Sequence, residues 1–121
     1  MSERAEQLKK RSMKFALDVC RLIKSLPYHE PGPTVRRQLA RSSTSMAFHY
    51  RAACRARSHA EFTAKMGTVS EESDETLGWL EFIDEARLMA SPIPGPLIQE
   101  AMELVAIFSA TYGTARANQH E

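Results

Sequence analysis

One apolar heptad pattern occurs four times along this chain of 121 residues. Within each copy, apolar or small side chains recur at alternating intervals of four and three residues, which places them on one side of an α-helix. The four copies span Leu8–Leu26, Val35–Ala53, Phe62–Ile83 and Leu97–Ala115. Helices with one apolar side bury that side by packing around a common core. The pattern therefore predicts an all-α fold, an antiparallel up-down-up-down four-helix bundle.

Residues that start or stop helices bound the four segments. Ser2 and Ser58 are favoured N-cap residues, and Glu61 follows Ser58 at the spacing of a capping box. Prolines and glycines within 27–33 and 92–96 predict the first and third loops. We expect one four-helix-bundle domain, residues 1–121, with helices at about 3–26, 34–57, 59–90 and 96–117.

The composition argues against several classes of protein. Cys20 and Cys54 are too few for a disulfide framework, as expected in a reducing compartment. The charged N-terminal segment does not resemble a signal peptide, and no segment approaches the ~20 apolar residues that a membrane span requires. We therefore expect a soluble, cytoplasmic protein that has no membrane partner.

The chain lacks the side-chain spacings of a catalytic, cofactor or metal site. It has no Glu-x-x-His pair of a di-metal bundle, and no cysteine–histidine set with zinc-ligand spacing. A glycine-rich phosphate loop and a nucleophile elbow are also missing from the sequence. His49 lies near the apolar pattern, where we expect a hydrogen-bonded, buried histidine. We expect no catalytic residue, no cofactor and no metal, and hence no enzyme.

Charge is distributed unevenly among the helices although the net charge is only +1. Residues 34–57 carry six arginines and no acid, whereas residues 59–90 carry eight acids and two basic side chains. Consecutive helices of a bundle lie side by side, so the simplest interpretation is that these two helices attract one another.

The outward side of the second predicted helix carries an arginine-rich stripe. Its residues are Arg37, Arg41, Thr44, Phe48, Arg51 and Arg55. Guanidinium groups beside an aromatic ring can hold phosphates and stack on a base. The candidate nucleic-acid contacts are therefore Arg37, Arg41, Phe48, Arg51 and Arg55. Arginine also favours bidentate carboxylate partners, so the alternative is that the stripe pairs with Glu72 and Glu75 of a neighbouring subunit.

Three helices carry apolar side chains away from the heptad pattern, more than one bundle of this size can bury. The additional positions are Met13, Leu17 and Cys20; Trp79, Phe82 and Met89; and Ile98, Val105, Ile107 and Tyr112. Burying one large side chain contributes ~1.5–3 kcal/mol, so a few of them can drive self-association. The expected oligomer interface comprises Met13, Leu17, Glu72, Glu75, Trp79, Phe82 and Ile107.

Three stretches of the chain resemble one bacterial protein family. Residues 38–46, Gln-Leu-Ala-Arg-Ser-Ser-Thr-Ser-Met, are similar to a Gln-Leu-Arg-Arg run that enters a helix of small residues. Residues 72–82, Glu-Ser-Asp-Glu-Thr-Leu-Gly-Trp-Leu-Glu-Phe, resemble a Glu-Ala-Asp-Glu-Thr-x-x-Trp-Leu-Glu block. Residues 103–108 and 114–118 are similar to a closing helix. The family comprises four-helix-bundle proteins encoded in intervening sequences of large-subunit ribosomal RNA genes.

The second helix departs from the family pattern. Where members commonly have Ile-Pro-Ser-Asn-Ile-Ala-Glu-Gly, residues 46–53 read Met-Ala-Phe-His-Tyr-Arg-Ala-Ala. Phe48 and Arg51 are gained, while the proline, asparagine, acid and glycine are lost. We expect this helix to be straighter and more basic than in relatives.

The resemblance implies an up-down-up-down bundle that assembles as a ring, a homopentamer. Relatives include accessory proteins of diversity-generating retroelements, which work with a reverse transcriptase and with RNA or DNA through a basic surface. The leading hypothesis is therefore a non-enzymatic, homo-oligomeric scaffold that binds RNA or a ribonucleoprotein partner through its second helix. The alternative is a purely structural or protein-docking oligomer.

Overall fold

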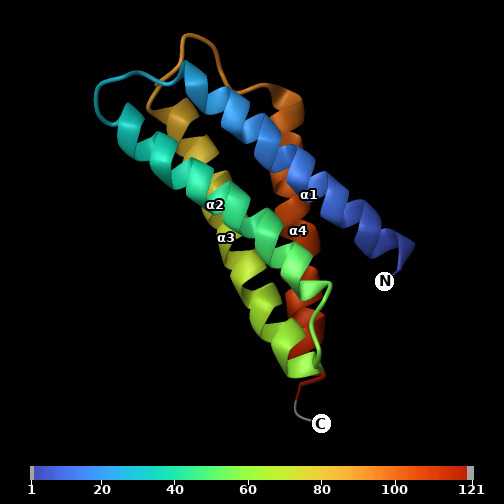
Figure 1. Cartoon of the computed structure of the whole chain (residues 1–121). Helices are drawn as coiled ribbons and strands as arrows, with labels where there is room; N and C mark the ends of the chain where they lie inside the picture. The colour runs from blue at the N-terminus through green and yellow to red at the C-terminus, as the bar shows by residue number, and fades with distance from the viewer. Residues whose placement is uncertain (1, 120–121) are drawn as a thin grey trace.

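The computed structural model describes residues 2–119 and has four helices in the up-down-up-down arrangement predicted from the heptad pattern (Figure 1). They are α1 (Glu3–Leu22), α2 (Gly32–Ala53), α3 (His59–Glu85) and α4 (Gly95–Ala117). One 3-10 turn, η1 (Ile23–Ser25), continues α1. Residues 2–119 contain no strand, so the all-α four-helix bundle is confirmed. None of these helices is long and apolar enough to cross a membrane.

The helix starts follow the predicted caps with one difference. The Ser2 hydroxyl accepts a hydrogen bond from the Ala5 N–H, and the Ser58 hydroxyl accepts one from the Glu61 N–H, both at 3.1 Å. The Glu61 carboxylate, however, accepts from the N–H of Arg57 at 3.1 Å, one residue before the donor that a capping box uses.

The second and third helices end earlier than the sequence predicted, at Ala53 and Glu85. After Glu85 the backbone of Arg87 adopts the left-handed conformation, with φ 53°, and the Leu88 N–H bonds to the Ile83 carbonyl at 3.1 Å. This geometry closes a helix as a C-terminal glycine usually does, although no glycine marks it in the sequence.

The core lies along the heptad pattern. The fully buried large side chains include Val19, Leu39, Met66, Leu104 and Phe108. In α2 the heptad spacing allows either His49 or Tyr50 to face the core. The buried residue is Tyr50, whose ring centroid is 5.0 Å from that of Phe108. Half-buried His49 lies beside it, and its Nδ1 is 2.9 Å from the Ser45 carbonyl oxygen and 3.1 Å from the Ser45 hydroxyl.

Small side chains allow α2 and α3 to approach closely. Ser42 and Thr76 are both 0 % exposed, and their hydroxyl oxygens are 2.9 Å apart across the two helices. By contrast, α1 is inclined across α4 and touches it much less than α2 touches α3 (Figure 1). The antiparallel α2–α3 hairpin is therefore the tightest part of the bundle, and the side between α1 and α4 is the most open.

Candidate nucleic-acid interface

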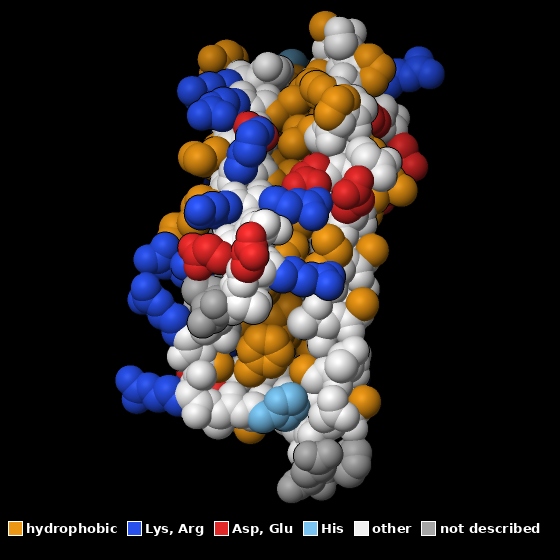
Figure 2. Space-filling model, turned by 90° about the vertical axis from the view of Figure 1, so that its right-hand side faces the viewer, with side chains coloured by type: hydrophobic (Ala, Val, Ile, Leu, Met, Phe, Trp, Pro, Cys, Tyr) orange, Lys and Arg blue, Asp and Glu red, His pale blue; other side chains and the backbone are white. Residues whose placement is uncertain are grey.

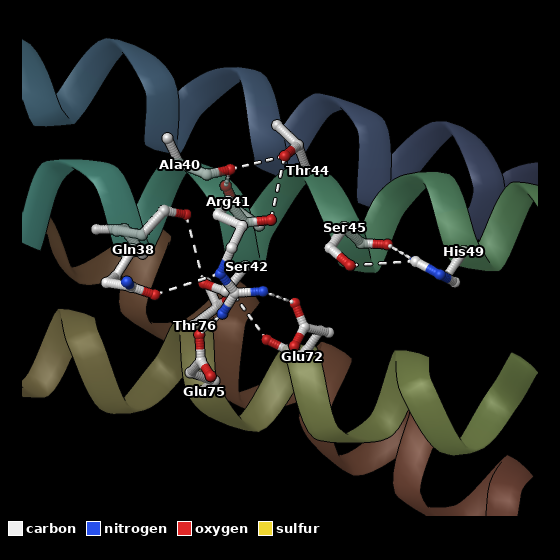
Figure 3. Close-up of polar contacts among 12 residues, drawn as sticks. Gln38, Ala40, Arg41, Ser42, Thr44, Ser45, His49, Glu72, Glu75 and Thr76 are labelled. Carbon is white, nitrogen blue, oxygen red and sulfur yellow. Dashed lines mark hydrogen bonds and ion pairs between the residues drawn. The ribbon is translucent and has the colours of Figure 1, made fainter.

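Arg41, in the middle of the arginine-rich stripe, forms ion pairs with two acids of its own chain (Figure 3). Its Nη1 is 2.7 Å from Glu72 Oε2, its Nη2 contacts Glu75, and its Nε is 3.3 Å from the Gln38 side-chain oxygen. The hydrogen bond to Glu72, with the charges of both acids, raises the pKa of Arg41 and keeps the guanidinium charged.

This contact corrects the predicted pairing of Arg41 with acids of a neighbouring subunit. Arg41 and Glu72 stand one residue before Ser42 and four before Thr76, so the close approach of α2 and α3 brings them together. Position 41 therefore lies opposite Glu72 and Glu75 in the same chain. Arg41 would have to leave these carboxylates before its guanidinium could bind a phosphate.

Arg37 lies apart from the rest of the stripe, one turn closer to the start of α2. Its Nη2 is 3.4 Å from the hydroxyl of Thr34, a residue that also donates two hydrogen bonds to the Glu30 carboxylate. Those bonds, and to a smaller extent the charge of Arg37, lower the pKa of Glu30. Arg37 is itself exposed, and its contact with Thr34 is local to the start of α2.

The remaining stripe residues line a shallow surface depression of about 440 Å³ at the other end of α2. Phe48 and Arg51 come from α2, Arg55 and Arg57 from the turn that follows, and Lys65 from α3. Ala52 and Glu61 complete the lining. We call this surface the Phe48 depression. Phe48 itself is 55 % exposed, although it is a large apolar side chain.

The Phe48 depression is strongly positive. Among residues 2–119, no carboxylate lies within ion-pair distance of Arg51, Arg55, Arg57 or Lys65. Its one acid, Glu61, accepts a hydrogen bond from the backbone of Arg57 instead. Several unpaired cations around one carboxylate attract anions, and the guanidinium groups add donors suited to phosphate oxygens.

The sequence prediction missed Arg57 and Lys65. Neither fits the four-and-three spacing of the stripe, because one lies in the turn after α2 and the other on the next helix. Only the shortness of the connection at residues 54–58 indicated that they would meet the end of the stripe.

The predicted interface residues lie on three helices, α1, α3 and α4, and differ in exposure. Leu17 on α1 and Phe82 on α3 are exposed at 50 % and 42 %, and Phe82 packs edge-on against half-buried Trp79 with ring centroids 5.5 Å apart. Ile107 is also half-buried and packs against the core, and Met13 is half-buried on α1. Much of the apolar surface expected between subunits is thus partly covered within one chain.

A furrow that the sequence did not reveal separates α1 from α4. Its upper part is a cleft of about 680 Å³ with Phe15, Leu22 and Leu97 in its wall. Arg11 spans it, with Nε 3.0 Å from one carboxylate oxygen of Glu100. Figure 2 shows hydrophobic side chains along this furrow, with acidic and basic side chains meeting across its middle. The open furrow follows from the inclination of α1, which heptad spacing does not encode.

Candidate metal ligands are not gathered in the part of the chain that the structure describes. Within residues 2–119, no group of three or more histidine, cysteine, aspartate or glutamate side chains could hold a metal ion.

Comparison with known proteins identifies a family and a related solved structure. The model of the 23S rRNA-intervening sequence protein family matches residues 4–110. A crystal structure of a protein with unknown function from the S23 ribosomal protein family of Bacteroides thetaiotaomicron is similar, with a TM-score of 0.76 and 25 % sequence identity. The similarity covers 86 % of this chain and 96 % of that one. No curated protein matches the chain.

Proposed function

The chain belongs to the 23S rRNA-intervening sequence protein family, and on that premise we propose that it is a non-enzymatic, homo-oligomeric scaffold that binds RNA through the Phe48 depression. The RNA is free or part of a ribonucleoprotein, such as a complex with a reverse transcriptase, as the resemblance to retroelement accessory proteins implies. A cytoplasmic location accords with such a partner.

The observation that carries this proposal is the group of unpaired cations around exposed Phe48. Phosphate contacts from lysine and arginine supply most of the sequence-independent affinity of proteins for nucleic acid. Arg51, Arg55 and Arg57 are exposed, and Lys65 is half-buried beside them. No bond within residues 2–119 has to break before they meet a phosphate, whereas Arg41 would have to leave Glu72 and Glu75.

Self-assembly would strengthen binding by presenting several depressions to one RNA. Exposed Leu17, Phe82 and Met102 and the apolar furrow between α1 and α4 support an oligomer, since each large side chain buried contributes ~1.5–3 kcal/mol. We propose the homopentamer that the family resemblance implies. Linked sites raise overall avidity without any new contact, so a modest affinity per subunit suffices.

The second candidate is a protein-docking oligomer in which a neighbour's acids fill the Phe48 depression. It is favoured by the exposed acids of α3, which are Glu71, Asp74, Glu81 and Glu85. None of them has an ion-pair partner within residues 2–119. In this version the pairs between subunits would involve Arg51 and Arg55 in place of Arg41.

One double variant distinguishes the two functions. Arg51→Gln with Arg55→Gln removes two cations from the depression, and Arg21→Gln with Lys24→Gln removes two from the opposite end of the bundle as a control. Binding to a structured RNA is measured by fluorescence anisotropy over a salt series, and mass is measured by light scattering against the 13.6 kDa subunit.

RNA binding through the depression predicts that the first variant loses about one unit of salt slope per lost contact while the oligomer persists. The control should keep most of the affinity. Dissociation of the oligomer, combined with no RNA binding by the wild type, would support the docking function instead. If neither property changes, both functions are wrong for this surface.

A further inference from the structure

We propose that the Phe48 depression binds an unpaired nucleotide, whose base stacks on the Phe48 ring while the surrounding cations hold the adjacent phosphates. The inference rests on the proposed RNA-binding function and deepens it, because it specifies a single-stranded segment and not a duplex as the ligand.

The Phe48 ring lies open on the surface, and Phe48 is the most exposed phenylalanine of residues 2–119. The other phenylalanines have packing partners: Phe15 and Phe108 are buried, Phe62 packs against the core, and Phe82 packs on Trp79. Phe48 is 55 % exposed, and no aromatic ring within residues 2–119 stacks on it. A large apolar surface is therefore open to solvent inside a depression.

Four cations lie in the same depression as the Phe48 ring. Arg51 follows Phe48 by three residues, so the two side chains lie on the same side of α2, and Arg55 reaches the same depression from the turn that follows the helix. Arg57 and Lys65 close the depression from the turn and from α3. The aromatic ring and four cations from α2, the turn and α3 thus line one depression, which suits a strand whose base stacks on the ring while its phosphates meet the cations.

A duplex and a single strand present different chemical groups to the Phe48 ring. In a duplex the faces of each base are covered by its neighbours, and the deep, narrow major groove of A-form RNA is closed to side chains. A duplex would therefore present sugar and phosphate to Phe48, a poor partner for an exposed phenyl ring. An unpaired base offers its π-face, and stacking on an aromatic side chain is tolerant of base identity.

The depression fits a nucleotide better than an apolar protein surface. An apolar partner would take Arg51, Arg55, Arg57 and Lys65 out of water without supplying counter-charges, which is unfavourable. A nucleotide supplies an apolar ring face and an anion together.

The test uses two substitutions of the ring and one control elsewhere. Phe48→Leu keeps an apolar side chain and removes the aromatic face, whereas Phe48→Tyr keeps that face. Tyr28→Leu is the control, because Tyr28 is 90 % exposed and lies 5.6 Å from the Arg36 guanidinium, outside the depression. The ligands are an unstructured twelve-nucleotide RNA, fluorescently labelled, and the same strand annealed to its complement.

We expect Phe48→Leu to weaken single-strand binding about 5- to 150-fold at constant salt, the range found for loss of one stacked base. The salt slope should stay the same, since no cation is removed. Duplex binding should change little for any variant, and Phe48→Tyr and Tyr28→Leu should bind the single strand nearly as well as wild type does.

A spectroscopic measurement tests stacking directly. The chain has one tryptophan, so Phe48→Trp combined with Trp79→Phe moves the only indole into the depression. Adding the single strand should quench the fluorescence of that indole, and adding the duplex should not.

Each other result has a definite meaning. Equal affinity of wild type and Phe48→Leu for the single strand, or binding without indole quenching, would overturn the stacking proposal and leave the RNA-binding function in place. A wild type that binds neither RNA would overturn both. If the wild type binds a glutamate-rich peptide and neither RNA, the ligand is an acidic protein and the proposal is refuted.

Discussion

Gly32, the first residue of α2, offers a sharp test of packing at the bundle's upper end. It is buried, and an ideal Cβ on it would lie 2.0 Å from the carbonyl oxygen of Pro27 and 2.8 Å from its carbonyl carbon. Real Cβ atoms are essentially never closer than 3.0 Å to another heavy atom, so Gly32→Ala forces a backbone movement of about 1 Å. The movement is resisted because Arg36 donates hydrogen bonds to the Leu26 and Pro27 carbonyls at 2.9 and 3.3 Å.

Overpacking of this kind destabilises by ~1–3 kcal/mol. Gly95 supplies a matched control, because it also begins a helix and is followed by proline, yet a Cβ there would have no atom within 4 Å. At an unobstructed site Gly→Ala stabilises by ~0.4–1 kcal/mol through the unfolded chain. Any penalty of placing alanine before proline applies to both variants.

The two substitutions should therefore shift the urea midpoint in opposite directions, and the free energies of unfolding should differ by ~1.5–4 kcal/mol at an unchanged m-value. Protein concentration is held constant, since an oligomer makes stability concentration-dependent. If Gly32→Ala is as stable as Gly95→Ala, the turn adapts freely and the inferred contact with Pro27 is wrong.

Two further predictions concern surface charges. Arg41→Gln should lower the free energy of unfolding in urea by less than ~1 kcal/mol, because the Arg41 side chain is 48 % exposed. It should not weaken RNA binding as the Arg51 and Arg55 substitutions do. A large loss of RNA affinity would show that Arg41 leaves Glu72 to contact phosphate. The pKa of Asp18 lies below its ordinary value of 3.8, mainly because Lys14 donates a hydrogen bond to its carboxylate. The ion pair therefore stabilises the fold at a pH above 3.8. This stabilisation is lost as the pH falls through the lowered folded-state pKa. The stability difference between wild type and Asp18→Asn should accordingly shrink in urea titrations taken from pH 6 to pH 2, and a difference independent of pH would contradict this assignment.

The heptad pattern predicted most of the core because helical spacing places those residues on the inward side of each helix. It left the choice between His49 and Tyr50 open, and packing settled it, since the Tyr50 ring meets Phe108. The end of α3 was not predictable in the same way, because Arg87 takes a backbone conformation that arginine rarely adopts.

The arginine-rich stripe was predicted as one continuous surface, and the structure divides it. Residue spacing on one helix shows which side chains share a side, but the register between helices decides which of them meet acids. That register joins Arg41 to Glu72 and leaves Arg51 and Arg55 without carboxylate partners among residues 2–119. Lys65 reaches the same surface from the next helix, and only the short connection at residues 54–58 indicated its position.

All residues that line the Phe48 depression lie within one short stretch, from Phe48 to Lys65, and none of them belongs to the buried core. Substitutions at positions without shared partners contribute almost independently to stability. The surface can therefore exchange one set of side chains for another without altering the packing that holds the four helices together. A bundle of this kind can therefore change its surface at positions such as 48 and 51 while the scaffold stays the same.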